Sequence, residues 1–315
     1  MTEVLVPAAA KAAHDARVRL LNHLERAGYA FVSSTPATHR LVAERSSRAR
    51  AGNLRDVFGW GRAFHPDDLP PEVLDDLRRA GALIEDGSGC RSSLRVSTLD
   101  DRLHLHSSRG DDPQAVFLGP DSYRFVRFLD EVLAEAALPR RALDIGTGAG
   151  AGALTVASRA RDARVTAGDI NPMALGLAAA NAAHAGLDLD IVEGSGLDAV
   201  SGDFDLIIAN PPYIAGDGGR LYRDGGGALG GELALSWIEA GLTRLTPSGR
   251  FALYTGSPVV EGRHLLRDEI ERLARTAGAR VALEELDPDV FGGTLRQPAY
   301  RDVERIAAVG VVMSL

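Results

Sequence analysis

From residue 141 onward, short apolar segments alternate with segments of helical periodicity, and this alternation most constrains the fold. The apolar segments are residues 141–145, 163–170, 189–194, 204–210, 250–256, 279–286 and 305–315. The predicted helices between them are residues 151–160, 172–186, 233–245 and 264–278. Short, nearly continuous apolar strands joined by helices are typical of a parallel sheet covered on both faces. The pattern predicts an α/β fold with a mostly parallel sheet, whose last two strands run antiparallel because no helix separates them.

The first 110 residues follow a different pattern. Residues 8–28 have the periodicity of an amphipathic helix, and residues 70–83 form a shorter helix that opens with two prolines. Residues 92–108 are predicted to form a β-hairpin that turns at Leu99–Asp101. This order suggests a small α+β unit of the winged-helix type. The turn-rich segment that follows the hairpin predicts two domains, residues 1–112 and residues 113–315.

Charge is distributed unevenly along the 315 residues, which carry a net charge of −8. Residues 1–110 contain 16 basic and 14 acidic side chains, whereas the remainder contains 19 and 29. Nucleic-acid-binding proteins usually carry a basic surface, so the acidic larger part disfavours a nucleic-acid substrate without excluding it. A single cysteine excludes an internal disulfide, and neither a membrane span nor a secretory signal is recognisable. These features predict a cytoplasmic protein.

Three side chains are candidates for a metal site. His104 and His106 alternate on one predicted strand and therefore share a face, and Cys90 precedes them. No further ligand follows at a suitable spacing. We therefore expect no bound metal.

A glycine-rich turn follows the first strand of the alternating region. The strand ends at Asp144 and Ile145, and the turn "GTGAGAG" starts at Gly146. Glycines let the backbone turn sharply and approach a ligand at the start of the next helix. The G-x-G-x-x-G spacing of dinucleotide sites is not met, because its third glycine falls on Ala151. A carboxylate at Asp144 would repel a pyrophosphate and attract an ammonium group, such as the amino-acid end of S-adenosylmethionine.

The second strand of this region ends at Asp169. An acidic side chain at this strand end is suited to hydrogen bonding with the hydroxyl groups of a ribose. The alternative interpretation is that Asp169 caps the helix that begins at Pro172. The order of strand, glycine turn, helix, strand and acid favours a cofactor site.

The fourth strand ends in the tetrapeptide Asn210-Pro211-Pro212-Tyr213. Prolines cannot continue a sheet, so the strand stops where the ligand crevice of such folds opens. The Asn210 side-chain oxygen and the Pro211 carbonyl could together accept both hydrogens of an NH2 group. The Tyr213 ring offers a flat surface for a planar amide or base. The tetrapeptide is thus suited to presenting a planar nitrogen to an electrophile, although a simple turn is the alternative.

Residues 115–315 resemble the class I S-adenosylmethionine-dependent methyltransferases that carry this tetrapeptide. The segments "LDIGTGAG", "AGDINPMALGLAAANA" and "DFDLIIANPPYI" are most similar to HemK-type protein-(glutamine-N5) methyltransferases. The resemblance implies a Rossmann-like seven-stranded sheet and methylation of the glutamine in a Gly-Gly-Gln motif of a translation release factor. It implies cofactor contacts from Ser122, Asp144, Gly146, Thr147, Gly148, Gly150, Asp169, Ile170, Ser195, Gly196 and Asn210. Residues Asn210, Pro211, Pro212 and Tyr213 would hold the amide.

The predicted function is therefore N-methylation of a planar amide or amino nitrogen, with a protein glutamine as substrate. The alternatives are a methyltransferase acting on adenine N6 or guanine N2, a tailoring enzyme for a small metabolite, and a cofactor-binding regulator without catalysis. This chain departs from the family in its first domain and in the loop "GSGLD", where the family often has an aromatic residue. Both tryptophans, Trp60 and Trp237, are predicted to be core residues. The glycine-rich residues 214–232 are predicted to be a lid, with Arg220, Tyr222 and Arg223 facing the substrate.

Overall fold

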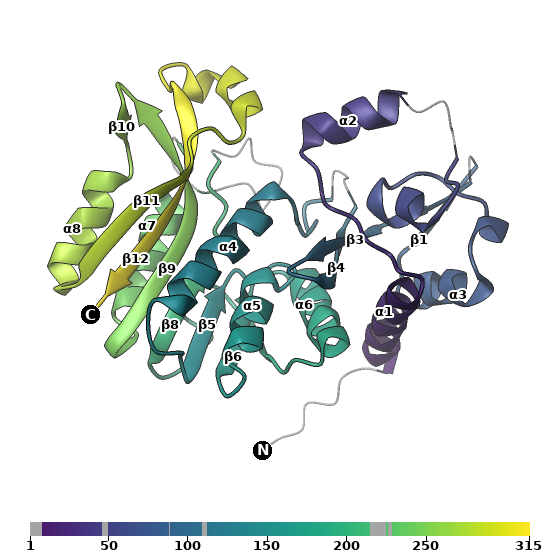
Figure 1. Ribbon diagram of the computed structural model, residues 1–315, viewed down its shortest axis with the longest axis horizontal. Helices are drawn as coiled ribbons and strands as arrows, with labels where there is room; N and C mark the ends of the chain where they lie inside the picture. The colour runs from purple at the N-terminus through teal and green to yellow at the C-terminus, as the bar shows by residue number, and fades with distance from the viewer. Residues whose placement is uncertain (1–7, 46–49, 88, 109–111, 215–224, 226–228) are drawn as a thin grey trace.

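The computed structural model describes residues 8–45, 50–87, 89–108, 112–214, 225 and 229–315 (Figure 1). Its central sheet has the strand order β11-β12-β9-β8-β5-β6-β7. These strands are β5 (Arg141–Ile145), β6 (Arg164–Asp169), β7 (Asp190–Glu193), β8 (Phe204–Ala209), β9 (Leu245–Val260), β11 (Arg280–Asp287) and β12 (Arg305–Ser314). A two-residue strand, β10 (Arg263–His264), pairs with the end of β9. The Rossmann-like α/β fold is thereby confirmed.

Strand directions follow the pattern expected from the sequence. β5 is parallel to both β6 and β8, and β7 and β9 continue the parallel sheet on the two sides. β12 runs antiparallel to both of its neighbours, β9 and β11. The prediction for the last two strands is confirmed. The strand predicted at residues 250–256 is longer than expected, since β9 begins at Leu245 and ends at Val260.

Helices cover both faces of the sheet, because the apolar side chains of its central strands alternate between two cores. On β8, Leu206 and Ile208 face the core under α4 (Pro120–Ala134) and α5 (Ala151–Arg159). Ile207 faces the other core, with α7 (Glu232–Leu242) and α8 (Arg267–Ala277). Figure 1 shows α4 and α5 across the face of the sheet toward the viewer. Each fully buried Leu or Ile contributes roughly 1.5–3 kcal/mol to the free energy of unfolding.

The N-terminal region contains three α-helices and two hairpins among its described residues. They are α1 (Ala8–Arg26), α2 (Pro36–Arg45), α3 (Pro71–Arg79), β1 (Leu83–Asp86), β2 (Gly89–Ser92), β3 (Leu94–Leu99) and β4 (Arg102–Ser107). The β3–β4 hairpin and its turn are confirmed, with Asp100 and Asp101 both at positive φ, as a two-residue hairpin turn of the primed type requires. The sequence pattern did not predict α2 or the β1–β2 hairpin, and the winged-helix type of this region stays a prediction.

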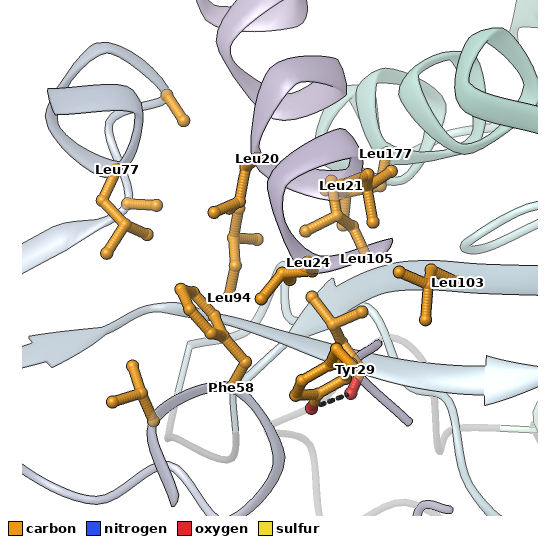
Figure 2. Packing of buried hydrophobic residues seen from close by; sticks show 14 of the residues in the cluster. Leu20, Leu21, Leu24, Tyr29, Phe58, Leu77, Leu94, Leu103, Leu105 and Leu177 are labelled. Carbon is orange, nitrogen blue, oxygen red and sulfur yellow. Dashed lines mark hydrogen bonds between the residues drawn. The ribbon is translucent and has the colours of Figure 1, made fainter. Parts of the chain in front are cut away.

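The N-terminal region packs directly against a helix of the large sheet, α6 (Pro172–Ala185). Leu20, Leu21 and Leu24 of α1 share one core with Leu105 of β4 and Leu177 of α6 (Figure 2). A buried hydrogen bond, from the Tyr29 hydroxyl to the carbonyl of Val96 at 2.8 Å, closes this core on the β3 side. The two regions of the chain are therefore joined by a continuous apolar core.

The side chain of Asn181 on α6 forms hydrogen bonds across this interface. Its carbonyl accepts a hydrogen bond from the Leu105 backbone N–H at 2.8 Å, and its NH2 group donates to the carbonyls of Leu105 and Ala149 at 3.0 and 2.9 Å. Asn181 is fully buried, so an unmade hydrogen bond here would carry a large desolvation cost. Asn181 thus forms hydrogen bonds with both the N-terminal hairpin, at Leu105, and the glycine turn, at Ala149.

Candidate active site

A cavity opens at the carboxyl ends of β5, β6 and β8, where ligands bind in open α/β sheets. Nearly every residue that the sequence assigned to the site contributes to its wall. These residues are Ser122, Asp144, Gly146, Thr147, Gly148, Asp169, Ile170, Ser195, Gly196, Asn210, Pro211, Pro212 and Tyr213. The loops after four strands and the first turn of α4 therefore converge on one space.

Gly150 is the exception, because it does not belong to this lining. It takes a left-handed conformation with φ +84° just before α5. A Cβ at this position would lie 2.7 Å from Leu154 Cδ1 and 3.1 Å from Ala178 Cβ. Gly150 therefore has a packing role, which lets α5 approach α6 closely, and the cofactor contact expected at Gly150 stays a prediction.

The glycine turn is fixed by hydrogen bonds to the neighbouring strand. The backbone N–H groups of Gly146 and Thr147 both donate to the Gly168 carbonyl, at 2.8 and 2.9 Å. Gly148 N–H donates to the Asp169 carboxylate at 2.9 Å. The protein's own hydrogen bonds therefore support the shape of the turn, which lowers the ordering cost of binding.

Asp144 is buried beneath this turn. One of its oxygens accepts hydrogen bonds from the Thr147 hydroxyl at 2.7 Å and from the Ala153 backbone N–H at 2.9 Å. Burial, together with the nearby charge of Asp169, raises the pKa of Asp144 to about 7 despite the lowering effect of the two hydrogen bonds. An ammonium group bound beside Asp144 would stabilise the carboxylate form and lower its pKa.

Asp169 links the end of β6 to the glycine turn rather than capping a helix. In addition to the bond from Gly148, its carboxylate accepts one from the Asn171 backbone N–H at 2.9 Å. The cap of α6 is Asn171 itself, whose side chain accepts from Met173 N–H at 2.9 Å. The helix-cap interpretation of Asp169 is therefore wrong. Burial raises the pKa of Asp169 as well.

Asn210 lies half-buried at the end of β8 and borders the cavity. Within the described part of the chain, neither its side chain nor the Pro211 carbonyl takes part in a hydrogen bond. Pro211 is buried, which fixes the backbone next to Asn210. The polar groups that could hold an NH2 group are consequently available to a ligand.

Tyr213 forms an aromatic wall beside Asn210 and is only 7% exposed. A Cβ on Gly256 would lie 2.3 Å from the Tyr213 ring, so this strand position must be glycine for the ring to lie there. Phe291 meets the ring edge to face, with centroids 5.6 Å apart. Burial and the facing Asp121 carboxyl raise the pKa of the phenol, and Asp121 itself accepts a 2.9 Å hydrogen bond from Tyr254.

Four aromatic residues of the lining were not predicted as site residues: Phe117, Phe125, Trp237 and Phe291. Trp237 was assigned to the core, but it is half-buried and borders the cavity together with Leu233, one helical turn earlier. This i, i+4 spacing was the only available signal. Phe291 lies between β11 and β12 in a left-handed conformation with φ 56°, which is unusual for a bulky residue and typical of functional sites. No sequence motif marks it.

Other candidates of the sequence analysis lie elsewhere. His106 shares a 2.9 Å hydrogen bond with Ser97, and His104 contacts the carbonyl of Arg102. No cluster of three potential metal ligands occurs among the residues that the structure describes. In the same part of the chain, no helix is long and apolar enough to cross a membrane. Arg220, Tyr222 and Arg223 of the predicted lid lie outside the described residues.

Comparison with known proteins agrees with this site. Residues 124–270 match the family described as Methyltransferase small domain. A release factor glutamine methyltransferase of Neisseria gonorrhoeae is 36% identical over 216 residues, which cover 62% of this chain and 76% of that protein. The chain belongs to the release factor glutamine methyltransferase family. Another member, from Deinococcus radiodurans, is 36% identical over 185 residues, 58% of this chain and 65% of its own length, so this match spans slightly less than two thirds of that relative.

Solved structures resemble the whole chain in fold. A putative transferase of Pyrococcus horikoshii, PH0793, superposes with a TM-score of 0.52 at 11% identity and covers 95% of this chain and 98% of its own. Trm5b of Pyrococcus abyssi gives a TM-score of 0.51 at 13% identity, covering 90% of this chain and 78% of that one. At these identities the likeness concerns the fold alone.

The residues at the β5–β7 end of the cavity fit the cofactor S-adenosylmethionine. Asp144 can face its ammonium group, and Asp169 can accept hydrogen bonds from its ribose. The backbone at Gly148 is open to the cavity, since a Cβ there would meet no atom closer than 4.0 Å. Ile170, which is 53% exposed, offers apolar surface for a flat ring. The donor and acceptor groups of the site thus match the groups of this ligand.

Proposed function

We propose that this protein transfers a methyl group from S-adenosylmethionine to the side-chain amide nitrogen of a glutamine in a translation release factor. The observation that carries this proposal is the position of Asn210 and Pro211, whose free oxygens border the same cavity as the glycine turn. Membership of the release factor glutamine methyltransferase family supports it. A simple turn would not need an unpaired amide at the mouth of a cofactor cavity.

The two acceptors define the geometry of the acceptor amide. Both hydrogens of its NH2 group would be bound, one by the Asn210 side-chain oxygen and one by the Pro211 carbonyl, and the Tyr213 ring would lie beside the plane of the amide. Bound S-adenosylmethionine supplies a methyl group on a positively charged sulfur. The amide nitrogen held by Asn210 and Pro211 would take up this methyl group and release a proton to solvent, and S-adenosylhomocysteine would be the second product. Catalysis rests mainly on positioning.

We assign substrate choice to the N-terminal region. Residues 1–112 would form a recognition domain and residues 113–315 the methyltransferase domain, although the two share one apolar core at α6. The single cysteine and a translation factor as substrate support a cytoplasmic location. The acidic charge of residues 111–315 disfavours a nucleobase as acceptor.

The proposal is tested with purified protein, S-adenosylmethionine labelled in the methyl group, and a release factor that carries a Gly-Gly-Gln motif. We expect a mass gain of one methyl group on the peptide with that glutamine, located by tandem mass spectrometry. A release factor with this glutamine replaced by alanine serves as the control and should take up no label.

A second arm uses whole lysate as a source of acceptors. Label removed by nuclease and not by protease would support the nucleobase alternative, and label in neither fraction would support a small molecule. Absence of label from the Gly-Gly-Gln glutamine in the purified reaction would overturn the proposal.

A further inference from the structure

Trp237 occupies an unusual place between the two glycine-containing loops of the cavity. The six-membered part of its indole faces the first loop, since a Cβ on Gly146 would lie 2.7 Å from Cη2. The five-membered part faces the second loop, since a Cβ on Gly196 would lie 3.5 Å from Nε1. Both glycines have positive φ, +68° and +54°, so neither position readily accepts a side chain. The loops at Gly146 and Gly196 therefore contact the indole ring through backbone atoms, because neither position carries a side chain.

The helix that carries Trp237 is anchored independently of the ring. Ala234, Ile238 and Leu242 of α7 are buried in the core below the sheet. Trp237 lies next to this buried face, and it borders the cavity as Leu233 does. A residue whose only role was to hold α7 in place would not need to reach the cavity.

The indole retains a free polar group. Its N–H makes no hydrogen bond with any residue in the described part of the chain, and the half-buried side chain leaves this donor available to a ligand or to solvent. The loop at residues 194–196 contains no aromatic side chain of its own. The flat apolar surface at this side of the cavity is instead supplied by a helix that follows β8.

We propose that Trp237 is a cofactor-recognition residue whose indole forms a wall of the subsite for the purine ring. This inference rests on the proposed function, because it requires a cofactor with an adenine. The ring lies against the loop at Gly196 on one side and the turn at Gly146 on the other, so it can contact a ligand that spans both. A purine buried against an aromatic side chain gains stacking energy that an aliphatic side chain does not supply.

The chain offers a direct test, because it contains only two tryptophans. In a Trp60→Phe protein, Trp237 is the sole source of tryptophan fluorescence, and titration with S-adenosylhomocysteine should quench or shift its emission. The matched control is Trp237→Phe, in which only Trp60 emits. Trp60 packs against Phe31 in the N-terminal region and does not border the cavity, so this protein should show no response.

Calorimetry supplies the second measurement. Trp237→Leu should weaken binding of S-adenosylhomocysteine about 10-fold or more, whereas Trp237→Phe keeps an aromatic ring and should lose no more than about 3-fold. Methylthioadenosine, which has the purine but lacks the amino-acid end, should lose affinity by the same factor in Trp237→Leu. If Trp237 acted only in folding, its substitution would lower the melting temperature, and Trp237→Leu and Trp237→Phe would bind S-adenosylhomocysteine with the same affinity.

The outcomes separate the inference from the function on which it rests. If S-adenosylhomocysteine fails to bind the unsubstituted protein, the proposed function is wrong. If it binds, but the Trp60→Phe protein shows no fluorescence change and Trp237→Leu binds normally, the inference about Trp237 is wrong and the proposed function stands.

Discussion

The two ends of the cavity are built in different ways. At the cofactor end, the buried carboxylate of Asp144 and the half-buried carboxylate of Asp169 accept four hydrogen bonds from the glycine turn and its surroundings. At the acceptor end, prolines and aromatic rings determine the shape, and the Asn210 side chain makes no hydrogen bond within the described part of the chain. One end is fixed by its own polar network. The other is fixed by packing, which leaves its polar groups for the substrate.

The largest effect should come from removing the free amide at the acceptor end. We expect Asn210→Ala to reduce turnover at least ~100-fold and to change cofactor affinity no more than a few-fold, since the lost contact is with the acceptor. Single-turnover kinetics and calorimetry measure the two quantities separately. An equal loss of both would show that Asn210 is structural and that the two ends are not distinct.

The packing of the acceptor end is tested by Gly256→Ala. The added Cβ would lie 2.3 Å from the Tyr213 ring and must displace it, so we expect turnover to fall about 30-fold with cofactor affinity nearly unchanged. Gly293→Ala is the control, because a Cβ there meets no atom within 4 Å and its φ is not positive. Unchanged turnover in Gly256→Ala would mean that Tyr213 does not shape the site.

At the cofactor end, Asp169→Ala should produce the opposite pattern. It removes an acceptor for the ribose and also the acceptor of the Gly148 N–H, so we expect cofactor affinity to fall about 10-fold or more. Turnover at saturating cofactor should stay within a few-fold of normal. Calorimetry with S-adenosylhomocysteine measures the first quantity. A large drop in turnover with unchanged affinity would reverse the assignment of the two ends.

The smallest effect concerns pH. Burial holds the pKa of Asp144 at about 7, so below this pH the group is increasingly neutral and attracts an ammonium group less. An α-amino group stays protonated below about 7.7, so cofactor affinity should rise about 3-fold or more between pH 6 and 7.5. In Asp144→Asn this rise should disappear. The same shift means that the ligand-free protein loses free energy of unfolding as pH rises from about 4 through 7, since the folded carboxyl has the higher pKa.

The sequence predicted those parts of the molecule that depend on local chemistry. Strand β5, the turn at Asp100 and Asp101, and the position of Asn210 follow from neighbouring residues, because alternation, turn preference and proline act over a few positions. The roles of Trp237 and Phe291 depend on which distant segments pack beside the cavity. Their contacts arise only when α7 and the segment after β11 are in place, so the spacing of Leu233 and Trp237 could not by itself identify the site, and no local pattern marked Phe291.

The hydrogen bonds of Asn181 have a consequence for the divergence of this protein. Its carboxamide recognises main-chain atoms of Leu105 and Ala149, and main-chain atoms are the same whatever side chain a position carries. The side chains of the hairpin that do not face α6 can therefore change while the hairpin still docks there, provided that it stays a strand and keeps its apolar contacts with Leu177. New specificities could accumulate in the N-terminal region without rebuilding the bond that attaches it to the catalytic half.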